Sequence, residues 1–276
     1  MNWRIARASL QGTSHVAGDV PCQDFNKVLQ FNDYVIIAVA DGLGSASKSD
    51  IGANIACSAG IDYICDELSN VQLQNTLFRR IKKLFRRSIP QPIDYNKLLC
   101  NAVDYARNKI SAQAIAESVS DAEYACTLIL TLIIGSEFHL VHVGDGAVVG
   151  VFASENQETV ETISGPDNGE YANSTTPITS PYYAEHVRYA CSSGDKKLQG
   201  IFVFTDGIQN LCINHQTKQA FNEFFTPILK WFREFAPDEN IDDKCVQLLN
   251  APRIREKSDD DLTLVVCYQN YQSHNS

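Results

Sequence analysis

The chain has 276 residues, of which 44% are hydrophobic and 20% are charged, a composition typical of globular proteins and unlike that of disordered, collagen-like or coiled-coil chains. Its formal net charge of −10 disfavours binding to the phosphate backbone of nucleic acids. The nine cysteines are odd in number and form no Cys-x-x-Cys pair, which excludes a regular disulfide framework and a cysteine-rich zinc site.

Apolar runs predict the secondary structure in chain order. Residues 34–40 are a β-branched run ending at Asp41-Gly42, and they predict a buried strand. Helical spacing follows over 50–68, 76–88 and 94–118. The next strands are expected over 125–134, 137–143, 147–153, 184–190 and 200–204. Helices over about 216–235 and 239–249 precede a last buried strand over 262–268.

The arrangement of these elements indicates an α+β fold. Neighbouring strands are joined by short turns, which favours antiparallel pairing. The helices gather in two blocks, so we expect them to cover the outer faces of the sheets. The polar stretch 154–182 is interpreted as one long loop, and since no linker interrupts the chain, residues 1–276 are expected to form a single domain.

The sequence predicts a cytoplasmic protein without a membrane span. The first residues contain no apolar run resembling a signal peptide. The longest apolar stretch, 125–134, is too short to cross a bilayer. Unpaired cysteines within apolar runs fit a reducing compartment.

Aspartates stand at the ends of several predicted strands. Asp-Gly pairs begin at Asp41, Asp145 and Asp206, each directly after an apolar run, while 259–261 are three aspartates leading into the last strand. Asp24 precedes the short segment 25–31. A single Asp-Gly pair is commonly only a turn. As a set, these aspartates could converge at one rim of a sheet.

Carboxylates brought that close need positive charge between them. Mg²⁺ and Mn²⁺ prefer oxygen ligands, and two such ions can activate a bridging water and polarise a phosphoryl group. No plausible Cys/His cluster supports zinc instead. The residues therefore indicate a two-metal hydrolase.

Five short motifs in this order resemble those of the metal-dependent type 2C protein serine/threonine phosphatases, over about residues 8–268. They are Asp24, Asp41-Gly42, Gly144-Asp145-Gly146, Thr205-Asp206-Gly207 and Asp260-Asp261-Leu262-Thr263. Segments 12–24, 40–53 and 169–179 look more like a bacterial branch of that family than its eukaryotic members. The resemblance implies a four-layer α/β/β/α sandwich of two antiparallel sheets flanked by helices, with a metal site at one end.

The resemblance also assigns roles to the aspartates. Asp41 would bridge two Mn²⁺ or Mg²⁺ ions, the Gly42 carbonyl would bind one of them, and Asp206 and Asp260 would hold the other. Asp24 would act mainly through metal-bound water. Asp145 matches the position that supports a third, weaker ion; the place four residues after Asp206, often acidic in members with this site, is Asn210. A neutral amide binds a hard cation weakly, so this site is expected to be weak.

The implied activity is hydrolysis of phosphoserine and phosphothreonine in proteins by direct attack of a metal-bridging water. The implied partners are a phosphorylated protein and a cognate serine/threonine kinase, with no nucleic acid. A runner-up is a catalytically weak signalling or binding module of the same fold. A third possibility is a two-metal hydrolase of a small phosphoester.

Three residues depart from the family pattern, and the second and third of them motivate the runner-up. Gln23 stands where the family often has Glu, Asp19 stands where eukaryotic members have a phosphate-binding Arg, and Leu43 replaces a His proposed as general acid. Another group must then meet the phosphate. His15 and Lys48 are the candidates, and His15 is also a candidate for proton transfer.

Residues 79–87 hold six of the 23 basic side chains. The segment is predicted to be an amphipathic helix packed on the outer face of a sheet with a solvated basic side. The alternative is a docking surface for an acidic partner or phosphorylated substrate.

Overall fold

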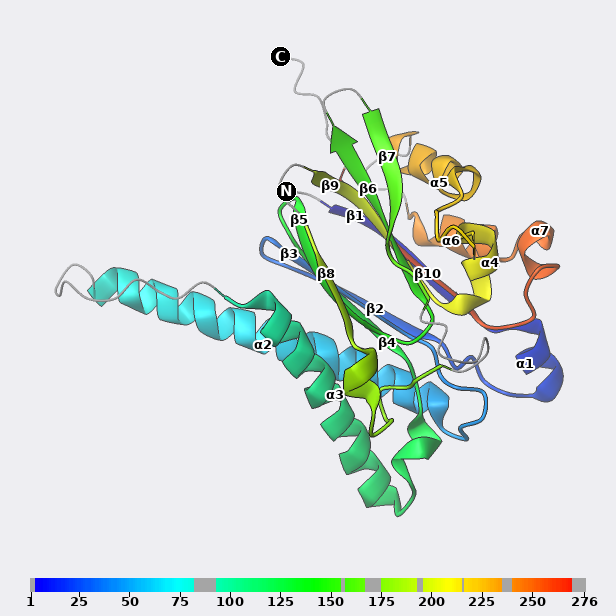
Figure 1. The fold of residues 1–276 in the computed structure, drawn as a ribbon, viewed down its shortest axis with the longest axis horizontal. Coiled ribbons are helices and arrows are strands. Elements are labelled where there is room, and N and C mark those ends of the chain that lie inside the picture. Colours follow the sequence, from blue (N-terminus) through cyan, green and yellow to red (C-terminus); the bar gives the residue numbers. More distant parts are fainter. Residues whose placement is uncertain are drawn as a thin grey trace.

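Two five-stranded antiparallel sheets pack face to face, and helices cover both outer faces (Figure 1). The structure, a computed structural model, describes residues 3–81, 93–154, 157–166, 175–192, 196–214, 216–234 and 240–269. The strand orders are β1-β10-β9-β6-β7 in the first sheet and β2-β3-β4-β5-β8 in the second. The α+β class and the four-layer α/β/β/α sandwich are confirmed.

Each sheet combines strands from distant parts of the chain. The first sheet consists of β1 (Trp3–Leu10), β6 (Ala147–Ser154), β7 (Gln157–Ser164), β9 (Lys197–Phe204) and β10 (Leu262–Gln269). The second consists of β2 (Phe25–Phe31), β3 (Tyr34–Ala40), β4 (Leu128–Ile134), β5 (Glu137–Val143) and β8 (Arg188–Cys191).

The helices fall into two groups. The second sheet is covered by α2 (Ser49–Ile81) and α3 (Tyr95–Glu117), and the first by α5 (Asn222–Glu234) and α6 (Asp242–Leu249). Shorter helices are α1 (Thr13–Gly18), α4 (Gln209–Cys212), α7 (Pro252–Arg255) and three 3₁₀ turns, η1 (Asp121–Tyr124), η2 (Tyr183–His186) and η3 (Asp206–Ile208). Among the described residues, no helix combines the length and the apolar character needed to cross a membrane.

Strand β3 explains how three apolar layers hold the sandwich together. Ile36 and Ala38 face the helices α2 and α3, whereas Ile37 and Val39 alternate with them and face the other sheet. All four side chains are fully or almost fully buried. A strand covered on both faces must be apolar at every position, which is why 34–40 is a continuous hydrophobic run.

Several sequence-based boundaries were wrong. The stretch 154–182 is not one long loop, because 157–164 forms β7, a partly exposed edge strand in which polar residues outnumber Val160 and Ile163. The strand expected over 184–190 is the shorter β8, preceded by η2. The helices expected over 50–68 and 76–88 are one continuous helix as far as Ile81, and 82–88 lie outside the described residues. The patterns also missed β1 and β2.

Gly52 shows how closely α2 approaches η1. A Cβ atom at Gly52 would lie 2.1 Å from the carbonyl oxygen of Tyr124. We expect Gly52→Ala to lower the free energy of unfolding by about 2–3 kcal/mol, since backbone must move to relieve the clash and this outweighs the ~1 kcal/mol by which alanine favours a helix. Urea denaturation measures the change.

Gly18→Ala is the matched control, because the nearest atom to its new Cβ would be 3.5 Å away. It should leave the unfolding midpoint nearly unchanged. A Gly52→Ala protein as stable as the Gly18→Ala protein would show that η1 does not constrain α2.

Candidate active site

Strand direction brings the aspartates to one end of the sandwich. β3 and β5 each pair antiparallel with β4, so both end at the same edge, where Asp41 and Asp145 follow them. In the other sheet, β9 pairs antiparallel with β10, so Asp206 after β9 and Asp260 before β10 also share an end. These four residues come from both sheets, and not from one rim of a single sheet as the sequence suggested, and they line one cavity.

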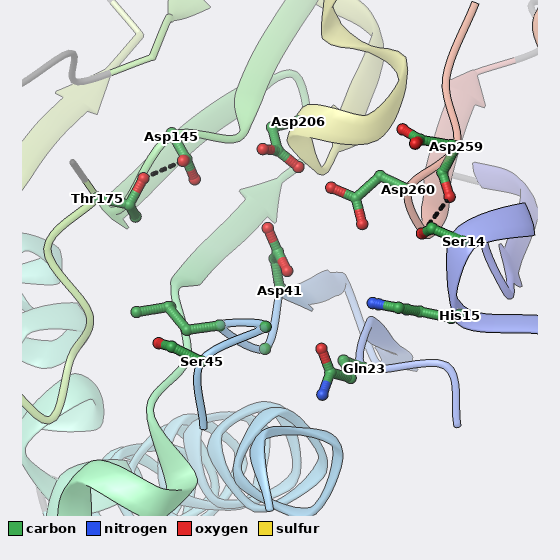
Figure 2. A pocket seen from close by; sticks show the side chains of 13 residues that line it. Ser14, His15, Gln23, Asp41, Ser45, Asp145, Thr175, Asp206, Asp259 and Asp260 are labelled. Atoms are coloured by element: carbon green, nitrogen blue, oxygen red, sulfur yellow. Dashed lines mark hydrogen bonds between the residues drawn. The ribbon is translucent and has the colours of Figure 1, made fainter. Parts of the chain in front are cut away.

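The four carboxyl groups point towards one another in an open cavity of about 550 Å³ (Figure 2). Its lining consists of Ser14, His15, Gln23, Asp41, Gly42, Leu43, Gly44, Ser45, Asp145, Thr175, Asp206, Asp259 and Asp260. One carboxylate oxygen from each of Asp41, Asp145 and Asp206 lies within 4.8 Å of the other two. This lining contains neither lysine nor arginine.

The crowded carboxyl groups resist ionisation. Burial, followed by the negative charges of Asp145 and Asp260, raises the pKa of Asp206 to about 7. Burial and then the charges of Asp24 and its other neighbours raise the pKa of Asp41 well above its usual value. The pKa of Asp260 is also raised, chiefly by burial. The described residues of the lining supply no lysine or arginine to balance these carboxylates, so the site is matched to a bound cation.

The residues present fit a hard divalent cation. Oδ1 of Asp145 is buried without a hydrogen-bond partner among the described residues, while Oδ2 accepts a hydrogen bond from Thr175 Oγ1. An unpaired buried carboxylate oxygen facing two further carboxylates is a ligand set for Mg²⁺ or Mn²⁺. In the part of the chain that the structure describes, no cysteine lines this cavity and the one lining histidine lies outside the three-carboxylate cluster, which disfavours zinc.

Backbone contacts fix the Asp41-Gly42 turn. The Asp41 backbone N–H donates to Thr127 Oγ1 at 2.9 Å, and the Thr127 N–H donates back to the Asp41 carbonyl at 2.8 Å. A Cβ at Gly42 would lie 2.7 Å from Cβ of Ser49, at the start of α2. Glycine lets α2 begin directly against the cluster, and Gly42 itself lines the cavity.

Asp24 lies behind the cluster and does not line the cavity. It is 6% exposed, and its Oδ2 accepts a hydrogen bond of 2.7 Å from Thr205 Oγ1. Burial raises its pKa well above the usual value, although the hydroxyl donors of Thr205 and Thr263 oppose this shift. Any influence of Asp24 on a substrate must therefore pass through groups that lie between them.

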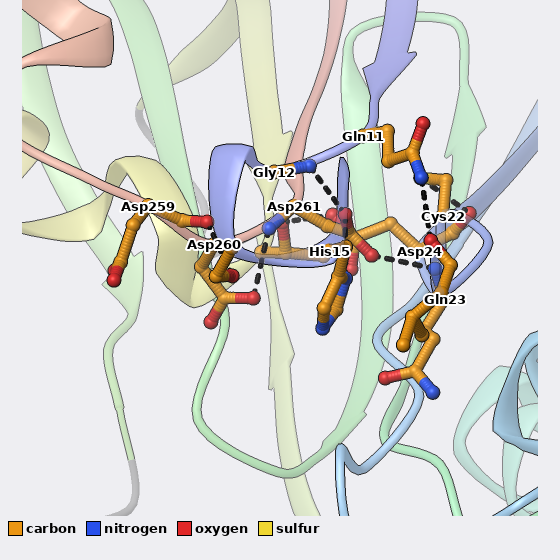
Figure 3. Close-up of polar contacts among 12 residues, drawn as sticks. Gln11, Gly12, His15, Cys22, Gln23, Asp24, Asp259, Asp260 and Asp261 are labelled. Carbon is orange, nitrogen blue, oxygen red and sulfur yellow. Dashed lines mark hydrogen bonds and ion pairs between the residues drawn. The ribbon is translucent and has the colours of Figure 1, made fainter. Parts of the chain in front are cut away.

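Asp261 is a buried anchor that the sequence motif did not reveal (Figure 3). Its Oδ1 accepts from the Gly12 N–H at 2.6 Å, and its Oδ2 accepts from the Gln23 N–H at 2.5 Å. Oδ1 also lies 2.9 Å from Nδ1 of His15, an ion-pairing contact that is not aligned as a linear hydrogen bond. The run of three aspartates at 259–261 was the available sequence signal, but spacing alone does not show which of the three is buried.

The segment before Asp24 is docked on the same aspartate run. Both the N–H and the hydroxyl of Ser14 donate to the carbonyl oxygen of Asp259, at 2.9 and 2.6 Å. A Cβ at Gly12 would lie 2.4 Å from the carbonyl carbon of Asp260, so glycine permits this approach. The docking brings His15 to the cavity, where its side chain is 18% exposed.

The other residues singled out from the sequence either lie outside the cavity or cannot transfer a proton. Lys48 does not line the cavity: its ammonium pairs with Glu117 and lies 5.7 Å from the centre of the Tyr124 ring. Asp19 ends α1 with a left-handed backbone, φ 53°. Leu43 lines the cavity and offers no titratable group. Among the described residues, His15 is thus the only basic side chain of the lining.

Thr175 is a second lining residue that the sequence did not reveal. It lies at the start of the described segment 175–192 and reaches Asp145 with its hydroxyl. Arg107 of α3 holds the same segment, donating to the carbonyl oxygens of Ile178 and Ser180. The basic segment 79–87 was predicted to pack on a sheet; its side chains lie outside the described residues.

Comparisons with known proteins agree with this geometry. Residues 11–244 match the family model described as protein phosphatase 2C. Over 274 residues, 96% of this chain and 98% of the relative, the sequence is 29% identical to serine/threonine-protein phosphatase 3 of Escherichia coli strain K12.

Solved structures share the fold at low sequence identity. A bacterial serine phosphatase superposes with a TM-score of 0.60 at 12% identity, covering 98% of both chains. The serine/threonine phosphatase of S. agalactiae superposes with a TM-score of 0.59 at 14% identity, covering 98% of this chain and 100% of that one. The Mycobacterium tuberculosis phosphatase PstP/Ppp gives 0.55 at 16% identity, with coverage of 98% and 100%.

Proposed function

This chain belongs to the protein phosphatase 2C family, and we propose that it is a metal-dependent phosphatase that hydrolyses phosphoserine and phosphothreonine in proteins by direct attack of water on phosphorus. The observation that carries the proposal is the cluster of Asp41, Asp145 and Asp206, whose carboxylate oxygens meet within 4.8 Å in an open cavity. A phosphorylated protein, and a kinase that phosphorylates it, are the partners this activity requires.

In this proposal Asp41, Asp206 and Asp260, with the Gly42 carbonyl, hold two Mn²⁺ or Mg²⁺ ions, and Asp24 supports them from behind. Bound cations would neutralise the cluster, lower the pKa of a coordinated water and polarise the phosphoryl group. The hydrogen bond from the Asp41 N–H to Thr127 Oγ1 fixes the backbone of Asp41, and the Thr205 hydroxyl holds the carboxylate of Asp24.

Water, and not a protein thiol, is the nucleophile in this proposal. No cysteine lines the cavity formed by the described residues. Cys22, the cysteine beside Gln23, has its pKa raised to about 12, first by burial and then by the charges of Asp24 and Asp261, so it stays a protonated thiol.

The direct test is hydrolysis of a phosphothreonine peptide by protein first stripped of metal with a chelator. We expect phosphate release only after Mn²⁺ or Mg²⁺ is restored, and little release from a matched phosphotyrosine peptide. Turnover of p-nitrophenyl phosphate without turnover of the phosphopeptide would favour a small-phosphoester hydrolase. Cation binding with no turnover of either would favour the signalling module.

We also expect two cations to bind tightly and a third weakly. Asn210 lies exposed on α4, one turn after Asp206, and contributes no charge. Calorimetric titration with Mn²⁺ should give two strong sites, and Asn210→Asp should strengthen a third, weak phase. A third site as tight as the first two in the unaltered protein would contradict this expectation.

A further inference from the structure

We infer that His15, oriented by Asp261, is the general acid that protonates the leaving serine or threonine oxygen. The inference rests on the proposed phosphatase function and adds a proton donor to it. Figure 2 shows the imidazole projecting from α1 into the cavity, between Asp260 and Gln23. The imidazole of His15 therefore lies next to the carboxylate cluster.

The contact with Asp261 determines which ring nitrogen faces the cavity. Nδ1 is fully enclosed and lies 2.9 Å from Oδ1 of Asp261, so this nitrogen faces the buried carboxylate and not the cavity. Nε2 is then the atom available to a substrate. In serine proteases, a buried carboxylate likewise holds one ring nitrogen of a histidine, and the other ring nitrogen transfers protons.

Asp261 is itself held rigidly. It is 3% exposed, and the N–H groups of Gly12 and Gln23 bind its two oxygens. Both donors belong to the segment that carries His15, so one carboxylate anchors the loop and orients the imidazole. Asp261 acts as a positioning residue because its own carboxyl group does not line the cavity.

The other lining groups are poor proton donors once cations are bound. A carboxyl group must be deprotonated to ligate a cation, which removes Asp41, Asp206 and Asp260. The remaining side chains that line the cavity are one further pair of aspartates, hydroxyls, an amide and Leu43. Of the described side chains that line the cavity, only His15 can carry positive charge near a phosphate dianion.

The step balances as follows. The oxygen of water forms a bond to phosphorus while the bond from phosphorus to the serine or threonine oxygen breaks, and its electron pair moves to that oxygen. The proton on Nε2 of the His15 imidazolium moves to the same oxygen, so an alcohol leaves. The attacking water releases one proton to solvent on becoming part of inorganic phosphate, and solvent returns one proton to His15, so no net proton is gained or lost.

The test is the dependence of kcat on the leaving group in the Mn²⁺-loaded enzyme. Phenyl, p-nitrophenyl and 2,4-dinitrophenyl phosphate have progressively better leaving groups, and the last needs no proton. His15→Gln should lower kcat on phenyl phosphate and on the phosphothreonine peptide by about 10²–10⁴-fold, and on 2,4-dinitrophenyl phosphate by less than about 10-fold. Asp261→Asn should show the same split, with a smaller loss.

His139→Gln is the matched control, because His139 bonds Tyr189 and stacks on Tyr95 outside the cavity. It should keep the leaving-group dependence of the unaltered enzyme. Mn²⁺ titration calorimetry should give unchanged affinity for His15→Gln, which separates proton transfer from metal loss. If His15→Gln does not fold, His15→Ala provides the test, with turnover of phenyl phosphate restored by added imidazole.

Equal losses on all three aryl phosphates, or a rise in KM with kcat unchanged, would overturn the inference and leave His15 as a phosphate-binding or structural residue. That result would leave the proposed function standing, because the unaltered enzyme would still be active. An unaltered enzyme that hydrolyses no phosphoester with Mn²⁺ would instead overturn the proposed function, and the inference with it.

Discussion

Asp41→Asn is expected to lower Mn²⁺-dependent turnover of the phosphothreonine peptide by about 10²-fold or more. Asp41 interacts with every other carboxylate of the cluster. Burial and then the charges of Asp24, Asp206, Asp145 and Asp260 raise its pKa. Asparagine keeps the size of the side chain but removes the charge that attracts a cation. Steady-state kinetics over a range of Mn²⁺ concentrations, with calorimetry of Mn²⁺ binding, measure the effect.

Asp33→Asn is the matched control. Asp33 is exposed in the turn between β2 and β3, and that turn joins the ends of the two strands opposite to Asp24 and Asp41. The same change of charge there should leave turnover and Mn²⁺ affinity within error of the unaltered protein. If Asp41→Asn retains full turnover at saturating Mn²⁺, the assignment of the metal centre is wrong.

Without metal, Asp206 should make the protein less stable as pH rises. Its pKa is about 7 in the folded state, against ~3.9 in an unfolded chain. Between these values the folded protein binds more protons than the unfolded one, so the free energy of unfolding falls with pH, by up to ~1.4 kcal/mol per pH unit from this group. The contribution is fully present below about pH 4 and is lost as pH rises through about 7.

Asp206→Asn isolates this contribution. In chelator, the variant and the unaltered protein should be similarly stable near pH 4, and the variant should be more stable by about 2–4 kcal/mol at pH 7.5. Saturating Mn²⁺ should reverse the order, because the unaltered protein gains binding energy that the variant lacks. Urea denaturation at each pH measures both effects, with Asp33→Asn as the control.

Two outcomes would contradict this prediction. The metal-free difference between Asp206→Asn and the unaltered protein could stay constant across the pH range, which would mean that Asp206 is not crowded by negative charge. Alternatively, Mn²⁺ could stabilise both proteins equally, which would place the cation away from Asp206.

Local sequence patterns predicted the class of fold and singled out the aspartates that line the cavity. The apolar run before Asp41 gave a buried strand because both faces of β3 are covered. Asp-Gly pairs at strand ends are short-range signals, and strand direction then brings Asp41, Asp145 and Asp206 together. These features can be predicted from the sequence because each depends on residues that are neighbours along the chain.

Other elements were invisible to pattern analysis for physical reasons. β7 is an edge strand with a partly exposed surface, and its Gln, Glu, Thr and Ser residues outnumber Val160 and Ile163, so its composition resembles that of a loop. β1 mixes arginine and serine with its apolar residues, and its pairing partner, β10, lies at the opposite end of the chain. In both strands, long-range pairing decides the conformation.

The choice between His15 and Lys48 depended on tertiary structure. Both looked equally able to meet a phosphate, but Lys48 is neutralised by Glu117 outside the cavity, while His15 is held at its wall. The carboxylate that holds His15 belongs to Asp261, 246 positions later in the sequence. The sequence by itself determined which residues could bind cations, whereas only the folded chain decided which side chain joins them, because that contact depends on how the ends of two sheets meet.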